Sequence, residues 1–309
     1  MEQEKKVFAE AIREFLWHCR FEKKLDEKTI RAYRADLRQM AEITGSTKDI
    51  FEVSKTDIKC YLQAIAHFKH KTIKRKIATL RSMLNYLECE YVNYINPMRK
   101  MQIKMKEPLR LPVVMTIEEM RLILNSLYSR TNNSAEDTYS YKAAIRNIAV
   151  VELLFASGMR VSELCSLRNK DVDMENGEVR IIGKGNKERI IHICQPVTWT
   201  ALHHWLELRT GVCDSQAPLF TNRLHRGLTT QSVRQIIRRI VSSTGIEKHI
   251  TPHTFRHTFA TLLLEEDVDV RYIQSLLGHS SIATTQIYTH VNLNKQRQIL
   301  QTKHPRRRI

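Results

Sequence analysis

The chain has 309 residues, of which 42% are hydrophobic, so it can form two domains of ordinary size that each bury a core. Its 50 lysines and arginines outnumber its 33 acidic residues, and the formal net charge of +17 at pH 7 favours a polyanion as partner. The longest apolar run, residues 148–159, contains Glu152 and is too short to span a membrane, which excludes a transmembrane protein.

The positive charge is distributed along the whole chain. Residues 1–107 hold 23 Lys and Arg against 15 Asp and Glu, a net +8, and the remainder holds 27 against 18, a net +9. Two domains that bind one polyanion fit this division better than a single basic tail. The six cysteines form no C-x-x-C pair, and the charged first residues do not resemble a signal peptide. We therefore expect a cytoplasmic protein with free thiols and no metal site.

Residues 1–95 carry the apolar periodicity of α-helices. Three apolar stripes predict the core of a small helical bundle: Phe8, Ile12, Phe15, Leu16 and Cys19; Ile30, Tyr33, Leu37 and Met40; and Ile73, Ile77, Leu80, Leu84 and Leu87. The last predicted helix also places Lys71, Lys74 and Arg75 on one side, away from its stripe. These cations form either a solvated face or a surface that contacts phosphates, and the overall charge keeps both interpretations open.

A domain boundary follows the bundle. Asn96-Pro97 ends the helical pattern, and residues 99–112 are basic with little periodicity, as in an interdomain linker. We expect a helical domain with its linker in residues 1–107 and a second domain in residues 108–309. Thr116 and Glu119 form a capping box that starts the first helix of this second domain. The polar residues 129–140 predict a mobile loop.

Strand patterns are confined to residues 170–193. Asn176-Gly177 predicts the turn of one hairpin and residues 183–187 that of the next, which gives a three-stranded antiparallel sheet. Helical patterns then continue to the C-terminus. The predicted fold class is mostly α with a small antiparallel sheet.

Six residues with reactive or charged side chains stand out in the second domain: Arg160, Lys184, His253, Arg256, His279 and Tyr288. Arg256 follows His253 by three positions in a predicted helix, so both project from one face. A guanidinium can bond two phosphate oxygens at once, and Arg160 and Arg256 together would stabilise a phosphoryl transition state. His279 follows a glycine predicted to end a helix and could bond a further phosphate oxygen.

Tyrosine suits covalent catalysis on a phosphodiester. Its pKa is about 10, so a phenolate leaves readily and a phosphotyrosyl bond stays reactive. His253 is a candidate proton acceptor for the Tyr288 hydroxyl, and Lys184 is a candidate proton donor to the leaving 5′-oxygen. The energy of the cut bond would be kept in the covalent intermediate, so the chemistry needs no ATP, metal or other cofactor. The six residues together suggest cutting and rejoining of DNA through a phosphotyrosine.

Each of these residues also has a simpler interpretation. Arg160 and Glu163 could form an i,i+3 ion pair, and a single Tyr or His is most often a packing or surface residue. The segment around Lys184 lacks the Walker A spacing of a phosphate-binding loop. His253 and His257 have the i,i+4 spacing of zinc ligands, but the glutamate of H-E-x-x-H is absent and no third ligand is evident. The set is far more specific than any of its members.

The chain resembles the tyrosine recombinases of the Xer and phage-integrase superfamily, most closely the short Xer-type members, over nearly its whole length. Residues 29–37 resemble the helical core-binding domain of that family, and the six residues occur in family order and spacing. The resemblance implies that Arg160, Lys184, His253, Arg256, His279 and Tyr288 form the active site, with Glu163 in support. Lys187 lies on the same hairpin as Lys184, which makes this one assignment the least secure.

The resemblance further implies a nucleoid-associated enzyme that acts on double-stranded DNA as a homotetramer or heterotetramer. Tyr288 would cut one strand of each of two duplexes, leaving a 3′-phosphotyrosine, and strands would exchange through a Holliday junction. The family passes its C-terminal helix to a neighbouring protomer, and residues 291–302 are the matching segment here. The end of the chain is short and partly apolar, so we expect it to gain little by folding back on its own domain.

Two departures from the family pattern and two alternative functions complete the prediction. Asp267 replaces a common glycine, but Asp tolerates left-handed geometry. Residues 129–140 exceed the corresponding segment of compact Xer proteins, which suits an integrase or invertase of a mobile element as well as a dimer resolvase. The alternatives are a type IB topoisomerase, which shares this chemistry, and a DNA-binding protein that has lost catalysis.

Overall fold

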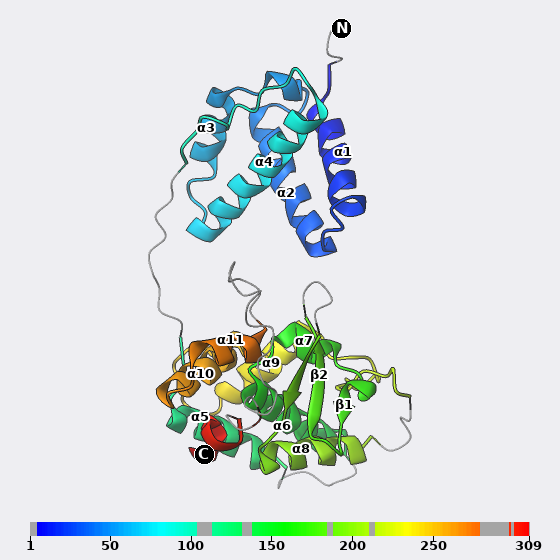
Figure 1. Ribbon diagram of the computed structural model, residues 1–309, viewed down its shortest axis with the longest axis vertical. Helices are drawn as coiled ribbons and strands as arrows, with labels where there is room; N and C mark the ends of the chain where they lie inside the picture. The colour runs from blue at the N-terminus through cyan, green and yellow to red at the C-terminus, as the bar shows by residue number, and fades with distance from the viewer. Residues whose placement is uncertain are drawn as a thin grey trace. The chain divides into compact units, whose positions relative to one another are not determined.

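The computed structural model describes residues 5–103, 113–131, 138–183, 188–209, 214–278, 297 and 300–308. The chain divides into two compact units, Met1–Arg110 and Leu111–Ile309 (Figure 1). Each unit has its own hydrophobic cluster. Among the described residues, no helix is long and apolar enough to cross a membrane.

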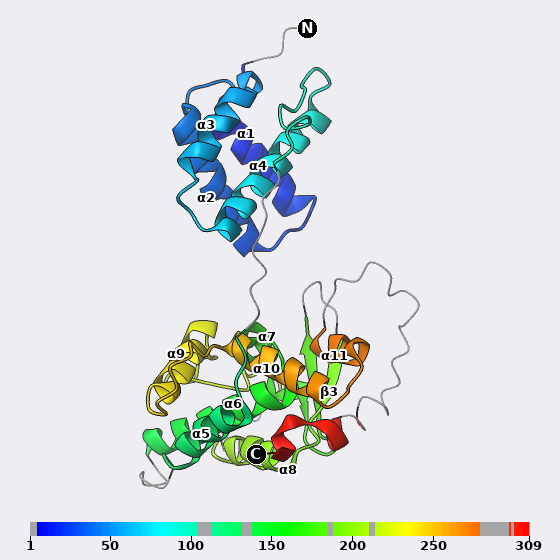
Figure 2. The ribbon, with the colours of Figure 1, turned by 90° about the vertical axis from the view of Figure 1, so that its left-hand side faces the viewer.

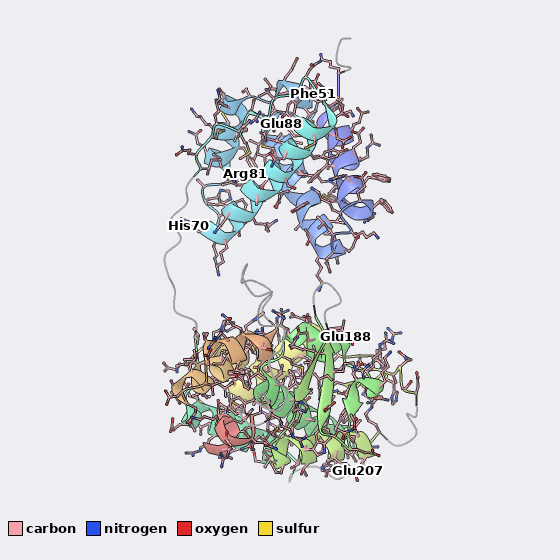
Figure 3. The ribbon with its side chains drawn as sticks, viewed as in Figure 1. Phe51, His70, Arg81, Glu88, Glu188 and Glu207 are labelled. Carbon is pink, nitrogen blue, oxygen red and sulfur yellow. The ribbon has the colours of Figure 1, made fainter. Side chains whose placement is uncertain are left out.

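In its described residues, 5–103, the first unit is a bundle of four α-helices. They are α1 (Phe8–Phe21), α2 (Glu27–Thr44), α3 (Lys55–Ala64) and α4 (His70–Glu90), with a short 3-10 helix, η1 (Ile50–Glu52), before α3. Figure 3 shows His70 at the start of α4 and Glu88 near its end. The three predicted stripes lie inside this bundle, all buried except the partly buried Tyr33. The helical prediction for this part of the chain is confirmed, although α4 ends at Glu90 and turns follow it.

The second unit is built mainly of helices, with a small sheet at one side (Figure 2). Its α-helices are α5 (Ile117–Tyr128), α6 (Tyr139–Ser157), α7 (Val161–Ser166), α8 (Pro196–Glu207), α9 (Thr230–Val241), α10 (Pro252–Glu265) and α11 (Val270–Leu277). The predicted capping box is present, since Thr116 and Glu119 bond each other's backbone amides at the start of α5. Of the predicted loop 129–140, residues 132–137 lie outside the described residues, and the last two belong to α6.

The sheet has the predicted three antiparallel strands. After the 3-10 helix η2 (Asn169–Asp171) come β1 (Val172–Asp173), β2 (Glu178–Ile182) and β3 (Glu188–His192), in the order β1-β2-β3. Ile182 pairs with Glu188, so the paired strands lie on either side of the predicted second turn, of which residues 184–187 are outside the described residues. Glu188 is labelled at the start of β3 in Figure 3. The prediction of a mostly helical fold with a small antiparallel sheet is confirmed.

Helix α6 forms the centre of the second unit. Its residues 148–157 are all buried, because the apolar run packs against α8 on one side and α10 on another. The helix ends at Gly158, which adopts the left-handed conformation with φ of 59°. A Cβ atom at this position would lie 2.5 Å from the ring of Phe259 in α10. Glycine is therefore required here both by the backbone and by the close approach of α10.

The end of the chain folds back onto its own unit. Leu300 is 1% exposed and belongs to a hydrophobic cluster with residues of α10 and α11, and the chain then closes with the 3-10 helix η4 (Pro305–Arg308) beside α10 (Figure 2). The prediction that the tail gains little by folding back is wrong for residues 300–308. The reason is that His304 and Arg306 form hydrogen bonds with Ala156 and Glu152 in α6, both of which are buried. The weak periodicity of the tail gave no sign of these distant partners. Residues 291–296 of the segment predicted to reach a neighbouring protomer lie outside the described residues.

Candidate active site

The His253–Arg256 pair lies where the sequence predicted it, in the first turns of a helix. Thr251 caps the N-terminus of α10 by accepting a hydrogen bond from the Thr254 amide, and Pro252 occupies the first turn, where its missing N–H costs nothing. His253 is exposed and Arg256 is 5% exposed. The helix thus presents an imidazole at its surface and holds a guanidinium beneath it.

Among the described residues, two backbone carbonyls bind the Arg256 guanidinium. Its Nη1 donates to the Gly158 oxygen at 2.9 Å and its Nη2 to the Leu277 oxygen at 2.7 Å. No carboxylate among the described residues forms an ion pair with it. Burial, and next the positive charge of Arg160, lower the pKa of Arg256 to about 10. Arg256 remains charged at neutral pH, and its charge is not cancelled by an ion pair.

Glu163 joins Arg160 to Arg189, a residue to which the sequence assigned no role. The Glu163 carboxylate is 5% exposed and accepts hydrogen bonds from Arg160 Nη1 at 2.8 Å and from Arg189 Nη2 at 2.7 Å. Burial alone would raise the pKa of Glu163, but the hydrogen bonds from Arg189 and Arg160 bring it below its usual value. The i,i+3 ion pair considered from the sequence exists, as one part of this three-residue arrangement.

Three arginines converge on the last carbonyls of α11. Arg189 Nε donates to the oxygen of residue 276 at 3.2 Å, Arg256 to that of residue 277, and Arg160 Nη2 to that of residue 278 at 3.3 Å. The C-terminal end of a helix carries partial negative charge and unpaired carbonyls, so it binds cations. Two of these guanidiniums, those of Arg160 and Arg189, bond the Glu163 carboxylate, and Arg256 bonds no described carboxylate, so the described part of the cluster keeps an excess of positive charge suited to an anion. The Arg160 side chain is 33% exposed and can reach a ligand.

His253 is poised as a neutral imidazole. Although the side chain is exposed, partial desolvation of the ring is the first cause that lowers its pKa, and the charges of His257, Arg234, Arg256 and Arg160 lower it further. A neutral imidazole can accept a proton at neutral pH. The chemistry that the described part of the site supports is therefore the binding of an anion by arginines next to a proton acceptor.

Three of the predicted site residues, Lys184, His279 and Tyr288, lie outside the described residues. Their neighbours are described. Gly183 follows β2 and precedes Lys184, and Gly278 ends α11 in the left-handed conformation with φ of 63°. His279 is thus the next residue after the carbonyls that the three arginines bind.

Sequence reasoning missed Arg189 because a strand pattern does not reveal distant partners. Arg189 lies on β3, and its carboxylate partner is 26 positions earlier in the chain. The sequence held one weak indication of its role. Arg189 is a charged residue in a short apolar strand, where a charge without a function is unusual. Asp267, by contrast, behaves as predicted, with a positive φ of 57° in the turn after α10.

The predicted cationic face of α4 divides in two. Arg75 forms an ion pair with Asp36 of α2, a carboxylate that is 1% exposed and also binds Lys76 Nζ at 3.0 Å. Lys71 and Lys74 are exposed. The guanidinium of Arg75 thus has a structural partner within its own unit, and the two lysines present the face to solvent.

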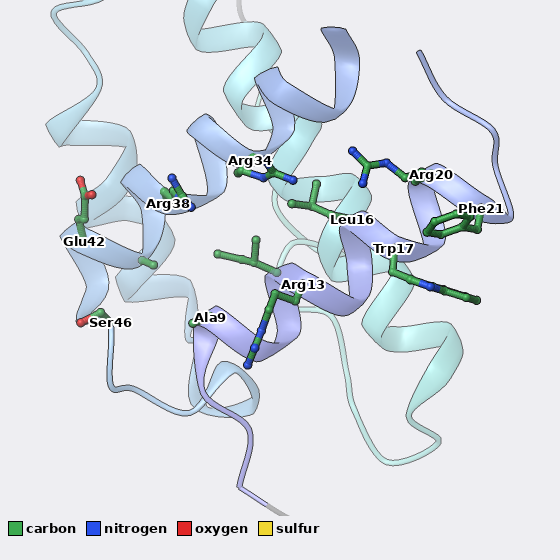
Figure 4. Close-up of a pocket in the computed structure, with 12 residues that line it drawn as sticks. Ala9, Arg13, Leu16, Trp17, Arg20, Phe21, Arg34, Arg38, Glu42 and Ser46 are labelled. Atoms are coloured by element: carbon green, nitrogen blue, oxygen red, sulfur yellow. The ribbon is translucent and has the colours of Figure 1, made fainter. Parts of the chain in front are cut away.

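A second cationic feature of the first unit is a groove between α1 and α2, with a volume of about 760 Å³ (Figure 4). Its aliphatic wall includes Ile12 and Leu16, and its aromatic edge is Trp17, whose ring lies 5.3 Å from that of Phe21. Four arginines surround it: Arg13, Arg20, Arg34 and Arg38. Both helices therefore contribute to the positive surface of this unit.

Comparison with known proteins connects these features to a family. Residues 114–295 match the phage integrase family, and residues 12–90 match the phage integrase N-terminal SAM-like domain. The chain belongs to the phage integrase family of tyrosine recombinases. This assigns it to an enzyme class, site-specific DNA recombinases, and the type IB topoisomerase alternative is not favoured.

Known recombinases match the chain over nearly its whole length. A tyrosine recombinase of Agathobacter rectalis is 41% identical over 297 residues, which cover 96% of each chain. Tyrosine recombinase XerD of Halalkalibacterium halodurans is 35% identical over 302 residues, which cover 96% of this chain and 97% of that one. The XerH site-specific recombinase bound to its difH substrate shares the fold, with a TM-score of 0.70 at 21% identity, covering 95% of this chain and 97% of that chain.

Proposed function

We propose that this tyrosine recombinase cuts DNA with Tyr288 as nucleophile, forming a 3′-phosphotyrosine and a free 5′-hydroxyl. His253 accepts the proton of the Tyr288 hydroxyl as the phenolate oxygen attacks phosphorus. Arg160 and Arg256 bind the non-bridging oxygens and stabilise the charge of the five-coordinate transition state. The observation that carries this proposal is the cluster of three arginines at the C-terminal end of α11, whose excess of positive charge over the Glu163 carboxylate matches a phosphodiester.

The remaining roles concern His279 and Lys184, which, like Tyr288, lie outside the described residues. His279 donates a hydrogen bond to a non-bridging oxygen of the same phosphate. Lys184 protonates the departing 5′-oxygen, because a deoxyribose alkoxide is a poor leaving group. In the reverse direction the phenolate leaves when a 5′-hydroxyl attacks, which seals the strand. Glu163 bonds Arg160 and is itself bonded by Arg189, so these two residues hold Arg160 in place rather than binding the phosphate.

The two units divide the work of binding DNA. Residues 1–107 grip the duplex through exposed cations such as Lys71 and Lys74, and residues 108–309 carry the catalytic site. A solved lambda integrase, 16% identical with a TM-score of 0.68, is a tetramer bound to a Holliday junction. We propose that this chain also assembles as a tetramer on two duplexes, either of identical chains or with a second recombinase. Its place of action would be the nucleoid in the cytoplasm.

A plasmid assay tests this function against the alternatives. The enzyme is incubated with supercoiled plasmid that carries two copies of a candidate site, taken from inverted repeats in the DNA beside its gene. Recombinant circles would support the proposal. Relaxed circles alone would point to topoisomerase activity, and bound but unchanged DNA to a silent DNA-binding protein. Either of those two results would contradict the proposal.

A further inference from the structure

The groove between α1 and α2 combines an apolar wall with arginines from both helices (Figure 4). On α1, Trp17 and Phe21 are four residues apart, about one helical turn, so their side chains follow each other along one edge of the groove. On α2, Arg34 and Arg38 have the same spacing and line the groove from the other helix. The connection between the helices, residues 22–26, is short, and the helices pack side by side, so the groove runs along both.

The two arginines on α2 keep their charge available to a ligand. Neither Arg34 nor Arg38 forms an ion pair with a described residue. Arg38 is exposed and Arg34 is half-buried, so both guanidiniums can be reached from solvent. The residues that line the groove include four arginines and one acidic residue, Glu42, a net of three positive charges.

The two arginines on α1 have only exposed partners. Arg20 Nη2 bonds the carboxylate of Glu27 at 2.6 and 2.9 Å, and Arg13 lies 3.9 Å from Glu10. All four of these side chains are at least 42% exposed. Ion pairs at such a surface contribute little to stability. Both guanidiniums can therefore exchange these carboxylates for those of a ligand.

The groove also leaves two large aromatic rings in water. The exposed fractions are 57% for Trp17 and 56% for Phe21, and the aliphatic side chains of Ile12 and Leu16 form part of the wall. Exposed apolar surface with a polar rim is typical of a protein-binding site. A DNA backbone is charged throughout and gains nothing from an aliphatic wall. The groove therefore fits an apolar surface that also carries carboxylates.

We propose that the groove between α1 and α2 docks an acidic amphipathic helix of a partner protein. The apolar face of that helix covers Trp17 and Phe21, and its aspartates or glutamates bind Arg34 and Arg38. The lining residues of α1 extend over positions 9–21, about 18 Å along the helix axis, which accommodates about three turns of a partner helix. The interaction goes beyond the proposed function, because it uses no residue of the catalytic unit.

The experiment measures the binding of a synthetic peptide to the full chain by fluorescence anisotropy. The probe is a labelled helical peptide of about three turns, with leucine and phenylalanine on one face and glutamates on both flanks. Isolated helices of this length are marginal in water, so a covalent staple on the outer face holds the helix. One control peptide has the same composition in shuffled order, so that its apolar residues no longer share a face. A second control has lysine in place of glutamate.

Two variants of the groove are compared with a matched control variant. Arg34→Gln with Arg38→Gln removes the two charges that lack an ion pair, and Trp17→Ser removes part of the aromatic edge. The control, Arg31→Gln with Arg81→Gln, removes two exposed arginines of the same unit that do not line the groove. Thermal unfolding shows that each variant folds. The two groove variants are independent, so either one alone tests the proposal.

The proposal predicts that wild type binds the acidic amphipathic peptide at least about tenfold more tightly than either control peptide. Each groove variant should lose at least about tenfold in affinity for it, because truncation of an anchoring aromatic or arginine residue has effects of this size at interfaces. The control variant should bind the peptide as wild type does. Equal binding of the shuffled peptide, or equal affinities of the groove and control variants, would overturn the proposal.

Two other occupants of the groove would give different results. If the groove binds DNA, Arg34→Gln with Arg38→Gln would weaken binding to a duplex of mixed sequence far more than Arg31→Gln with Arg81→Gln, and the peptide would not bind. If it binds a second copy of the chain, wild type would self-associate in sedimentation and the groove variants would not, again without peptide binding. Either result would overturn the proposal and leave the proposed function standing.

Discussion

The stability of the catalytic unit should depend on pH through His304. Burial, the first cause, holds the pKa of His304 at about 4, against an ordinary value of 6.5. The unfolded chain therefore binds a proton between pH 6.5 and pH 4 that the folded protein excludes, so the free energy of unfolding falls as the pH falls through this window. The difference between the pKa of His304 in the folded and the unfolded chain corresponds to about 3 kcal/mol of unfolding free energy. About 2 kcal/mol of this stability is lost between pH 7 and pH 4.5.

The assay compares two proteins by urea unfolding at a series of pH values: one carries Trp17→Phe alone, and the other carries Trp17→Phe with His304→Leu. Without Trp17, the fluorescence comes from Trp199 and Trp205 and reports on the catalytic unit alone. Protonation of His304 would place a proton on Nδ1, opposite the Arg306 amide, and Arg306 also opposes the new charge. The leucine variant lacks this penalty.

The expected result is a difference in unfolding free energy that shrinks by about 2 kcal/mol from pH 7 to pH 4.5. The pKa values of His253 and His257 are also lowered by burial, but these residues are present in both proteins and cancel in the difference. A difference that stays constant over this range would refute the reasoning. It would mean that His304 is hydrated or already protonated in the folded protein.

Three other perturbations test separate parts of the account. Lys184→Ala should impair cleavage and be rescued by a 5′-bridging phosphorothiolate, whose sulfur leaves without a proton; rescue of Lys187→Ala alone would assign the acid to Lys187. Gly158→Ala should destabilise the catalytic unit in thermal unfolding by about 2–4 kcal/mol, because the alanine would be strained in the left-handed conformation and would collide with a phenylalanine ring. Gly245→Ala is the control: its Cβ atom would meet open space, so only the backbone strain of about 1 kcal/mol remains. Equal losses of stability in the two variants would contradict the packing argument. DNA binding should weaken with salt at about 0.9 in log–log slope per phosphate neutralised, and a fragment of residues 108–309 should show a shallower slope; equal slopes would show that the first unit does not grip DNA.

Local chemistry made much of the fold predictable from the sequence. The capping box at Thr116, the hairpin after Asn176 and the glycine that ends α11 each depend on a few adjacent residues and on backbone geometry. The stripes of the first unit were equally clear because α-helical burial repeats every three to four residues. Such signals are complete within one element, so no distant partner was needed to interpret them.

The rest depends on contacts between distant parts of the chain. Arg306 and Glu152 are 154 positions apart, and the sequence shows only an acidic residue that interrupts an apolar run and a basic end that resembles a phosphate contact. Glu163 likewise gains Arg189 from a strand that folds against it. Periodicity shows which face of one helix or strand is buried, but not which distant residue lies against it. Two charged residues can compensate each other's desolvation only after the helices and strands that carry them have packed together.

The most direct test of the central claim is covalent trapping at Tyr288. Wild type and Tyr288→Phe are each incubated with a nicked half-site whose cut end diffuses away, and products are separated on a denaturing gel. The ring survives in the variant while the nucleophilic hydroxyl is lost, so both proteins should bind DNA with similar affinity. We predict a covalent protein–DNA band from wild type, with the DNA mapped by mass spectrometry to the peptide that contains Tyr288, and none from the variant. A covalent band from Tyr288→Phe would contradict the account.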